Sequence, residues 1–237
     1  MEPSSPQRAT AGVRLLLVRH GAQESSARRP PDQKHDPPLS EAGHQQAEAT
    51  AAAIAERLTS IGRYCSRATV FSSPMRRALH TAWPIARALG VQLVCCGDLH
   101  EFRAGAEPQR TAVAIAADGS LQPPGVVVKR FGPSGAWVGQ GVVETEALLR
   151  ERAAAVAQWL EAELSAELSA EAERRSGGVK SGALIIVVSH QTFLDCLAQT
   201  LLDQTADGFV YGAPKYEIAK AGVLSIACLP GGYSLEK

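Results

Sequence analysis

Short apolar runs alternate with longer helical stretches along this chain. Four runs are bounded by polar or turn residues and have the length and composition of buried strands: residues 13–18, 68–71, 91–94 and 183–188. A fifth candidate strand covers residues 222–229. The stretches between them are rich in Ala and Leu, and predict helices over about residues 40–58, 74–89, 144–172 and 192–202. This alternation predicts an α/β fold, a three-layer sandwich whose mostly parallel central sheet carries helices on both faces.

The first residues of two predicted helices carry recognisable signals. Ser73 followed by Pro74 is typical of an N-cap with proline at the first helical position, so we expect the second helix to begin there. The first helix has Ser40 before Glu41, but Gly43 lies inside its first turn and softens the expected start.

The regular pattern is interrupted in three places. We expect a flexible N-terminal segment at residues 1–12, followed by a single domain over residues 13–237. Residues 104–141 contain seven glycines and four prolines with little periodicity, which predicts an insertion over one end of the sheet. Residues 173–182 end in Ser, Gly and Lys and predict a mobile loop after a solvent-facing helix end.

Composition and charge exclude several function classes. The chain has 237 residues, 45% of them apolar, which is enough for a sizeable core. Its 24 basic residues equal its 24 acidic ones, so no basic surplus favours binding to nucleic acid or to a membrane surface. The five cysteines show neither zinc-site spacing nor the density of a disulfide scaffold, and no apolar run approaches the roughly 20 residues of a membrane span. We therefore expect a cytoplasmic protein with free thiols.

Histidines follow two of the predicted strands. The first strand leads into Arg19 and His20, and the fourth leads into Ser189 and His190. Open α/β sheets bind ligands at the carboxyl ends of their strands. Both histidines are therefore expected at one edge of the sheet.

Arginines are expected at the same edge. The run at residues 68–71 feeds a helix that places Arg76 and Arg77 within its first turn. The helix dipole favours anions at that end, so it does not explain two cations there. A bound anion does explain them, and Arg19 adds a guanidinium that can grip phosphate oxygens in pairs. The sequence predicts a crevice for one tetrahedral anion, with no counter-charge from the protein itself.

Four motifs contain these residues in a fixed order. LLVRHG includes His20, SSPMRRALHTA includes Arg77, LHEFRAG includes Glu101 and VVSHQ includes His190. Weaker similarities are DPPLSEAGHQQA and the stretch at residues 144–152. Together these motifs resemble those of the histidine phosphatase superfamily, also called the phosphoglycerate mutase-like fold. The resemblance covers residues 14–192, and implies that fold and the phosphatase branch of the family.

The resemblance also implies a role for each charged residue. His20 is the expected nucleophile, Glu101 the proton donor, and Arg19, Arg77 and His190 the phosphate-binding groups. The chemistry fits, because a neutral imidazole can attack phosphorus and form a phosphohistidine, while a carboxyl group can protonate the leaving oxygen and then activate water. Arginines supply the charge neutralisation that Mg²⁺ supplies elsewhere, so we expect neither a metal nor another cofactor.

Neighbouring residues receive other interpretations. Arg77 is matched because the family's arginine directly precedes the alanine that Ala78 matches, and Arg76 is expected at the rim or in solvent. We expect the adjacent Cys95 and Cys96 to pack in the core rather than to do redox chemistry. The remaining histidines are expected to be structural: His35, His44, His80 and His100.

Two glutamines depart from the family pattern. Gln23 stands where many relatives have Ser or Thr, and Gln191 stands where many have Gly after the second histidine. Neither change removes a charged group. We expect both glutamines to line the substrate site and to alter phosphate contacts or specificity.

Three functions are compatible with these motifs. The first is hydrolysis of a phosphomonoester, either a phosphorylated small molecule or a phosphopeptide, through a phosphohistidine. The second is phosphoryl transfer of the phosphoglycerate mutase type, and the third is binding of a phospho-ligand without catalysis. Mutases of this family carry extra basic residues after the acid motif, whereas residues 104–141 contain only Arg110, Lys129 and Arg130. Hydrolysis is therefore favoured.

Overall fold

The computed structural model describes residues 13–25, 36–60, 67–102, 127–128, 144–176, 183–203, 208–229 and 232–236. The described helices are α1 (Glu41–Ser60), α2 (Arg76–Leu89), the 3-10 turn η3 (Gly97–Leu99), α4 (Glu146–Ser176) and α5 (Gln191–Asp203). The described strands are β1 (Val13–Arg19), β2 (Arg67–Ser72), β3 (Leu93–Cys95), β4 (Val127–Val128), β5 (Ala183–Ser189), β6 (Val223–Leu229) and β7 (Gly232–Leu235). No described helix combines the length and the apolar character that crossing a membrane requires.

The strands form one mixed sheet in the order β4-β3-β2-β5-β1-β6-β7. The neighbours from β4 to β1 are all parallel, whereas β6 runs antiparallel to β1 and β7 antiparallel to β6. In the register of the central pair, Arg19 of β1 lies opposite Ser189 of β5. The two strands that precede the predicted histidines therefore end side by side.

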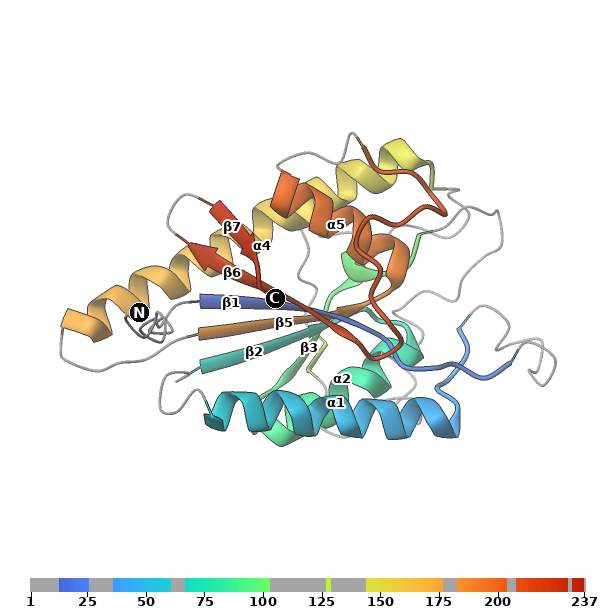
Figure 1. Cartoon of the computed structure of the whole chain (residues 1–237), viewed down its shortest axis with the longest axis horizontal. Helices are drawn as coiled ribbons and strands as arrows, with labels where there is room; N and C mark the ends of the chain where they lie inside the picture. Colours follow the sequence, from blue (N-terminus) through green and yellow to red (C-terminus); the bar gives the residue numbers. More distant parts are fainter. Residues whose placement is uncertain are drawn as a thin grey trace, which may run out of the picture.

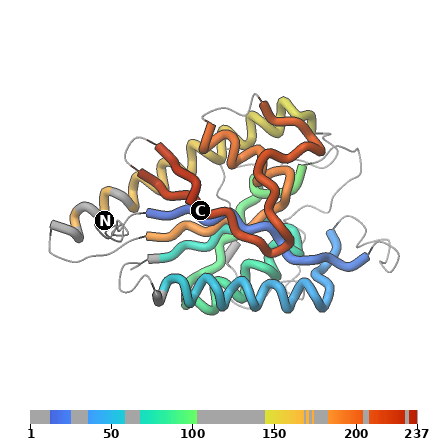
Figure 2. The backbone as a smooth tube through the Cα atoms, viewed as in Figure 1, coloured from blue at the N-terminus to red at the C-terminus, as the bar shows by residue number. Residues whose placement is uncertain are grey.

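Helices cover both faces of this sheet, so the predicted three-layer sandwich is confirmed. Helices α1 and α2 lie on one face, and α4 and α5 lie on the other (Figure 1). The backbone trace shows the segment between α5 and β6 passing beside the carboxyl end of β1 (Figure 2).

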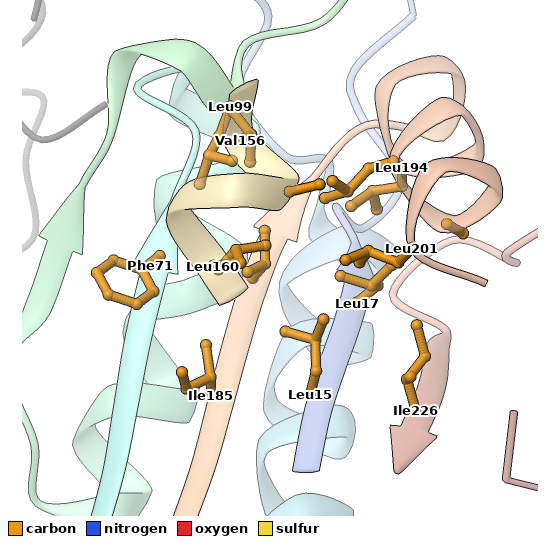
Figure 3. Packing of buried hydrophobic residues seen from close by; sticks show 14 of the residues in the cluster. Leu15, Leu17, Phe71, Leu99, Val156, Leu160, Ile185, Leu194, Leu201 and Ile226 are labelled. Atoms are coloured by element: carbon orange, nitrogen blue, oxygen red, sulfur yellow. The ribbon is translucent and has the colours of Figure 1, made fainter. Parts of the chain in front are cut away.

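Successive side chains along each central strand point to opposite faces of the sheet, so the sheet has an apolar core on each face. Leu15 and Leu17 of β1 face α4 and α5 together with Ile185 of β5, as the close view of this core shows (Figure 3). Leu16 and Val18 face the opposite core, against α1 and α2. Because both faces of each central strand are buried, its sequence is continuously apolar rather than alternating.

The observed boundaries correct several sequence predictions. Helix α2 begins at Arg76 with Met75 as its N-cap, not at Pro74 with Ser73 as the cap. Strand β3 begins at Leu93, two residues later than predicted. Helix α4 continues to Ser176, so the first residues of the predicted loop at 173–182 are helical.

Two short strands were absent from the sequence prediction. Strand β7 extends the sheet beyond β6, and β4 pairs with β3 at the opposite edge. Strand β4 lies within the predicted insertion, whose remaining residues from 104 to 141 are outside the described part of the chain, as are residues 1–12 and 177–182.

Candidate active site

The carboxyl ends of β1 and β5 bring the two predicted histidines together. The backbone N–H of His20 donates to the carbonyl of Ser189 at 2.9 Å, which continues the parallel ladder by one residue. The ring centroids of His20 and His190 are 5.0 Å apart. Both side chains are buried. The prediction that these residues share one edge of the sheet is confirmed.

Hydrogen bonds orient the His20 ring. Its Nδ1 lies 2.7 Å from the Gly21 carbonyl, an acceptor, so Nδ1 carries the proton and Nε2 keeps its lone pair. The Nε–H of Arg77 donates to this Nε2 at 3.2 Å. Burial, followed by the charges of Arg77 and Lys220, lowers the pKa of His20 to about 2. The imidazole is therefore neutral at physiological pH, and its Nε2 lone pair accepts the hydrogen bond from Arg77.

A carboxylate that the site prediction did not include lies beside Arg77. Oδ1 of Asp36 is 3.8 Å from Nη1 of Arg77 and accepts a hydrogen bond from the backbone N–H of Arg76 at 2.9 Å. The side chain of Arg76 is also buried, with its Nε 3.9 Å from Asp36 Oδ2. Arg76 was predicted at the rim or in solvent, but it is buried beside Asp36, and the prediction of a site without a counter-charge is wrong. The signal was the aspartate of the DPPLSEAG stretch, three residues before Leu39.

His190 is held by Ser73. Its Nε2 is 2.8 Å from Ser73 Oγ, and this oxygen accepts a hydrogen bond from the backbone N–H of Met75 at 3.3 Å. Burial, then the charge of Arg77, electrostatic interactions with the His20 and His100 rings, and the charge of Lys220 lower the pKa of His190 well below its usual value. The Nδ1 of His190 is buried and has no hydrogen-bond partner among the described residues. A neutral ring whose Nε2 accepts the Ser73 hydroxyl proton carries its own proton on Nδ1, ready for an incoming acceptor.

The segment that carries Glu101 is fixed by the residues beside it. Arg152 of α4 donates from Nη1 to the carbonyl of Asp98 at 2.6 Å and to that of His100 at 3.0 Å. Its guanidinium also forms a bidentate pair with Glu144, at 2.7 and 2.9 Å. This buried ion pair therefore holds the backbone that leads into Glu101.

Glu101 itself lies within the field of the site cations. Its Oε1 accepts the backbone N–H of Phe102 at 2.9 Å, and its side chain interacts electrostatically with Arg19 and Arg77. Burial raises the pKa of this carboxyl, and the hydrogen bond from Phe102 and the charge of Arg77 only partly offset that effect. Glu107, the alternative carboxylate in sequence, is outside the described residues.

Gln191 links Arg19 to the segment between α5 and β6. Its Oε1 accepts from Ile218 N–H at 2.9 Å and from Arg19 Nη1 at 3.3 Å, and its Nε2 donates to Tyr216 O at 2.9 Å. Arg19 Nη1 also donates to Ile218 O at 2.8 Å, while its Nε is buried without a partner among the described residues. Gln191 is thus a connector, and its contact with substrate stays a prediction.

Gln23 is exposed and forms an isolated bridge with Leu39. The chain that follows β1 packs closely on the start of α1. A Cβ added to Gly43 would lie 1.9 Å from the carbonyl oxygen of Ala22, so no larger residue fits there. Gly43 therefore permits this close contact.

The other residues interpreted in the sequence divide into two groups. Cys95 and Cys96 are buried free thiols, as expected, and burial raises the pKa of each to about 12. His100 is buried and its Nδ1 lies 2.7 Å from the Glu101 carbonyl, so it supports the acid segment. The rings of His44 and His80 lie 5.7 Å apart, and His35 is outside the described residues.

Lys220 is a further cation that the site prediction did not include. Burial and the charges of Arg19 and Arg77 lower its pKa to about 8, and the charge of Glu101 opposes this shift. The sequence around Lys220 does not distinguish it from a lysine of a surface loop. Its position near the histidines depends on tertiary contacts, which a local sequence pattern does not reveal.

Parts of this chain, or its whole fold, are similar to several known proteins. Over a stretch of 94 residues, this chain is 40% identical in sequence to a bifunctional protein of Mycobacterium tuberculosis. The matched stretch is 40% of this chain but only 24% of that protein. Among solved structures, the ecdysone phosphate phosphatase of Bombix mori superposes with a TM-score of 0.59 at 15% identity, covering 94% of this chain and 92% of the other. A mycobacterial glucosyl-3-phosphoglycerate phosphatase gives 0.55 at 22% identity, with 94% and 96% covered.

A third solved structure, the phosphoserine phosphatase of Entamoeba histolytica, gives a TM-score of 0.55 at 18% identity and covers 95% of each chain. These structures share the fold of this protein. The family model described as histidine phosphatase superfamily, branch 1, matches residues 15–237, which is nearly the whole chain. The chain therefore belongs to branch 1 of the histidine phosphatase superfamily.

Proposed function

We propose that this protein hydrolyses phosphomonoesters through a phosphohistidine at His20. The observation that carries the proposal is the orientation of the His20 ring. Its Nδ1 is bound to the Gly21 carbonyl, so its neutral Nε2 presents a lone pair beside the Arg77 guanidinium. This pairing supports the proposal, because a lone pair next to a guanidinium can attack a phosphoryl group that the guanidinium binds.

In the first step, His20 Nε2 attacks phosphorus and the bond from phosphorus to the ester oxygen breaks. Arg77 turns its Nε–H from His20 Nε2 to a phosphoryl oxygen, which frees the lone pair for attack. The leaving oxygen takes a proton from Glu101, whose raised pKa keeps that proton available to higher pH. The products of this step are an alcohol and a phosphohistidine.

In the second step, water attacks the phosphohistidine. Glu101, now a carboxylate, takes the proton from this water, and the bond from phosphorus to His20 Nε2 breaks. Inorganic phosphate leaves and the neutral imidazole is restored. One carboxyl group thus serves as acid and then as base.

Charge on the phosphoryl oxygens is neutralised by side chains of the protein. Arg19 and Arg77 supply two guanidinium groups, and the Nδ1–H of His190 supplies a donor that no described residue accepts. The His190 ring is already held by Ser73, so its donor can stabilise the transition state without reorganisation. We therefore propose catalysis without a metal ion, and expect full activity after treatment with a chelator.

The substrate proposed is a phosphorylated small molecule. The similar structures are named for glucosyl-3-phosphoglycerate, phosphoserine and ecdysone phosphate, which are all small phosphate esters. The basic residues that would bear on mutase activity, Arg110, Lys129 and Arg130, are outside the described residues. The four cysteines among the described residues are buried free thiols, which are compatible with a reducing compartment, and we propose a cytoplasmic location on that ground.

The direct test is a panel of phosphomonoesters given to the purified full chain, with release of inorganic phosphate as the readout. We expect turnover of at least one class of small ester by the wild type and none by His20→Ala. Phosphoryl transfer between two positions of a sugar phosphate, without release of phosphate, would instead establish the mutase reaction.

A further inference from the structure

The turn that contains Lys220 is bonded to the end of β1. The Ala221 N–H donates to the His20 carbonyl at 3.2 Å, and the Arg19 N–H donates to the Gly222 carbonyl at 3.1 Å. These two bonds flank the turn, so Lys220 lies directly beside the backbone of the proposed nucleophile.

The turn has an unusual backbone that its surroundings maintain. Ala221 has a φ of 57°, in the left-handed region that disfavours residues with a Cβ. Its carbonyl accepts a hydrogen bond from Thr50 Oγ1 at 2.7 Å, which ties the turn to α1. Strained residues of this kind persist where the surrounding structure fixes them, and they concentrate at functional sites.

The Lys220 side chain is half-buried among charges of its own sign. The groups that act on it electrostatically are Arg19 at the end of β1, Arg77 of α2 and, with opposite sign, Glu101 after η3. Its own charge in turn lowers the pKa of His20 and of His190. In the described part of the chain, Lys220 forms no ion pair and no side-chain hydrogen bond.

We propose that Lys220 binds an oxygen of the phosphoryl group that is transferred to His20, as a third cation beside Arg19 and Arg77. This inference rests on the proposed function of the site. An ammonium group offers three donors in a compact charge, which complements the planar guanidinium groups. A bound dianion relieves the repulsion among the three cations, and that relief contributes to its affinity.

This role has a consequence for pH. Lys220 binds phosphate as the ammonium form, and its pKa of about 8 in the empty site means that this form is lost above about pH 8. The ordinary pKa of a guanidinium group is above about 12, far from this range. Affinity for phosphate therefore falls by up to about tenfold for each pH unit above the Lys220 pKa, until it reaches the affinity of a site that lacks this charge.

The test measures binding of inorganic phosphate to the full chain by calorimetry. The variants are Lys220→Met, Lys220→Arg and the control Lys215→Met, which removes an exposed lysine paired with Asp203 at 2.8 Å. At neutral pH we expect Lys220→Met to bind phosphate about 10 to 100 times more weakly, because a charge-assisted hydrogen bond is lost. We expect Lys215→Met to match the wild type.

The arginine variant keeps the inference testable if the methionine variant does not fold. From about pH 8 to about pH 10, where phosphate stays a dianion, wild-type affinity should fall while Lys220→Arg should show a much smaller decline. The inference is overturned if Lys220→Met binds phosphate as the wild type does, if Lys220→Arg retains the full decline, or if the wild type binds no phosphate.

Failure of the proposed function gives a different result. If the wild type binds phosphate in a way that depends on Lys220 but hydrolyses no phosphomonoester, the binding site stands and the hydrolase assignment falls. If the wild type hydrolyses phosphomonoesters while Lys220→Met binds phosphate unchanged, the hydrolase assignment stands and the role of Lys220 is wrong.

Discussion

Ser73 Oγ lies 2.8 Å from His190 Nε2, and the direction of this hydrogen bond decides which nitrogen of the histidine carries its proton. The serine oxygen already accepts the Met75 N–H, so its own hydrogen is available for Nε2. The proton of a neutral His190 then resides on Nδ1, the atom that has no partner among the described residues. Under the proposed function, Ser73 is therefore a positioning residue for the donor with which His190 would bind phosphate.

Ser73→Ala should weaken this donor without removing it. The free ring can adopt either tautomer, so part of the population presents an acceptor instead of a donor to the phosphate. We expect kcat/KM to fall about tenfold, in line with the loss of one well-formed hydrogen bond. Nitrogen NMR of His190 would show mixed tautomers in the variant and a single tautomer in the wild type. An unchanged tautomer would assign Ser73 to packing alone.

Arg152 offers a test of stability with a matched control on the same helix. It is buried and forms a bidentate pair with Glu144, whereas Arg150 makes an exposed pair with Glu146 at 3.8 Å. Arg152→Met leaves a buried carboxylate without its guanidinium, and should lower the free energy of unfolding by about 3–5 kcal/mol. Arg150→Met should change it by less than about 0.5 kcal/mol. Urea unfolding of both variants measures the difference, and equal losses would contradict this account.

Glu101→Gln keeps the shape of the side chain but removes its proton. Its effect should depend on the leaving group, because general acid catalysis is worth roughly 10² to 10⁴ in rate only when the leaving oxygen needs a proton. Hydrolysis of an alkyl phosphate should nearly cease, while phosphorylation of the enzyme by p-nitrophenyl phosphate should persist. Wild-type activity on the alkyl ester should decline as the pH rises through the raised pKa of Glu101. Equal losses on both substrates would make Glu101 structural and would direct attention to Glu107.

The central strands could be predicted because burial on both faces requires continuous apolar sequence. The runs that became β1 and β5 are of this kind, and the polar residues that follow them are the site histidines. Strand β7 has only four residues and is partly exposed, so it has no such pattern. The sequence pattern predicts a start for α2 at Pro74, which is two residues too early. The Ser73 hydroxyl, the predicted cap, holds His190 instead.

Site residues could be predicted from the sequence only where a charged or histidine side chain directly follows a predicted strand or begins a predicted helix. Asp36 and Lys220 lie on irregular segments, and their places depend on contacts with residues distant in sequence. Asp36 reaches the backbone of Arg76 across 40 positions, and Ala221, next to Lys220, bonds to His20. No local pattern encodes such contacts, so they required the structure.

The most direct test of the central claim is to trap the phosphoenzyme. The full chain is mixed with a phosphate ester labelled in its phosphoryl group, quenched rapidly in alkali, and digested for mass spectrometry. We predict a label that is stable in alkali, lost in acid and located on His20, and that is missing from His20→Ala although the variant keeps its circular dichroism spectrum. Turnover with no covalent label, or a label on another residue that persists in His20→Ala, would contradict the account.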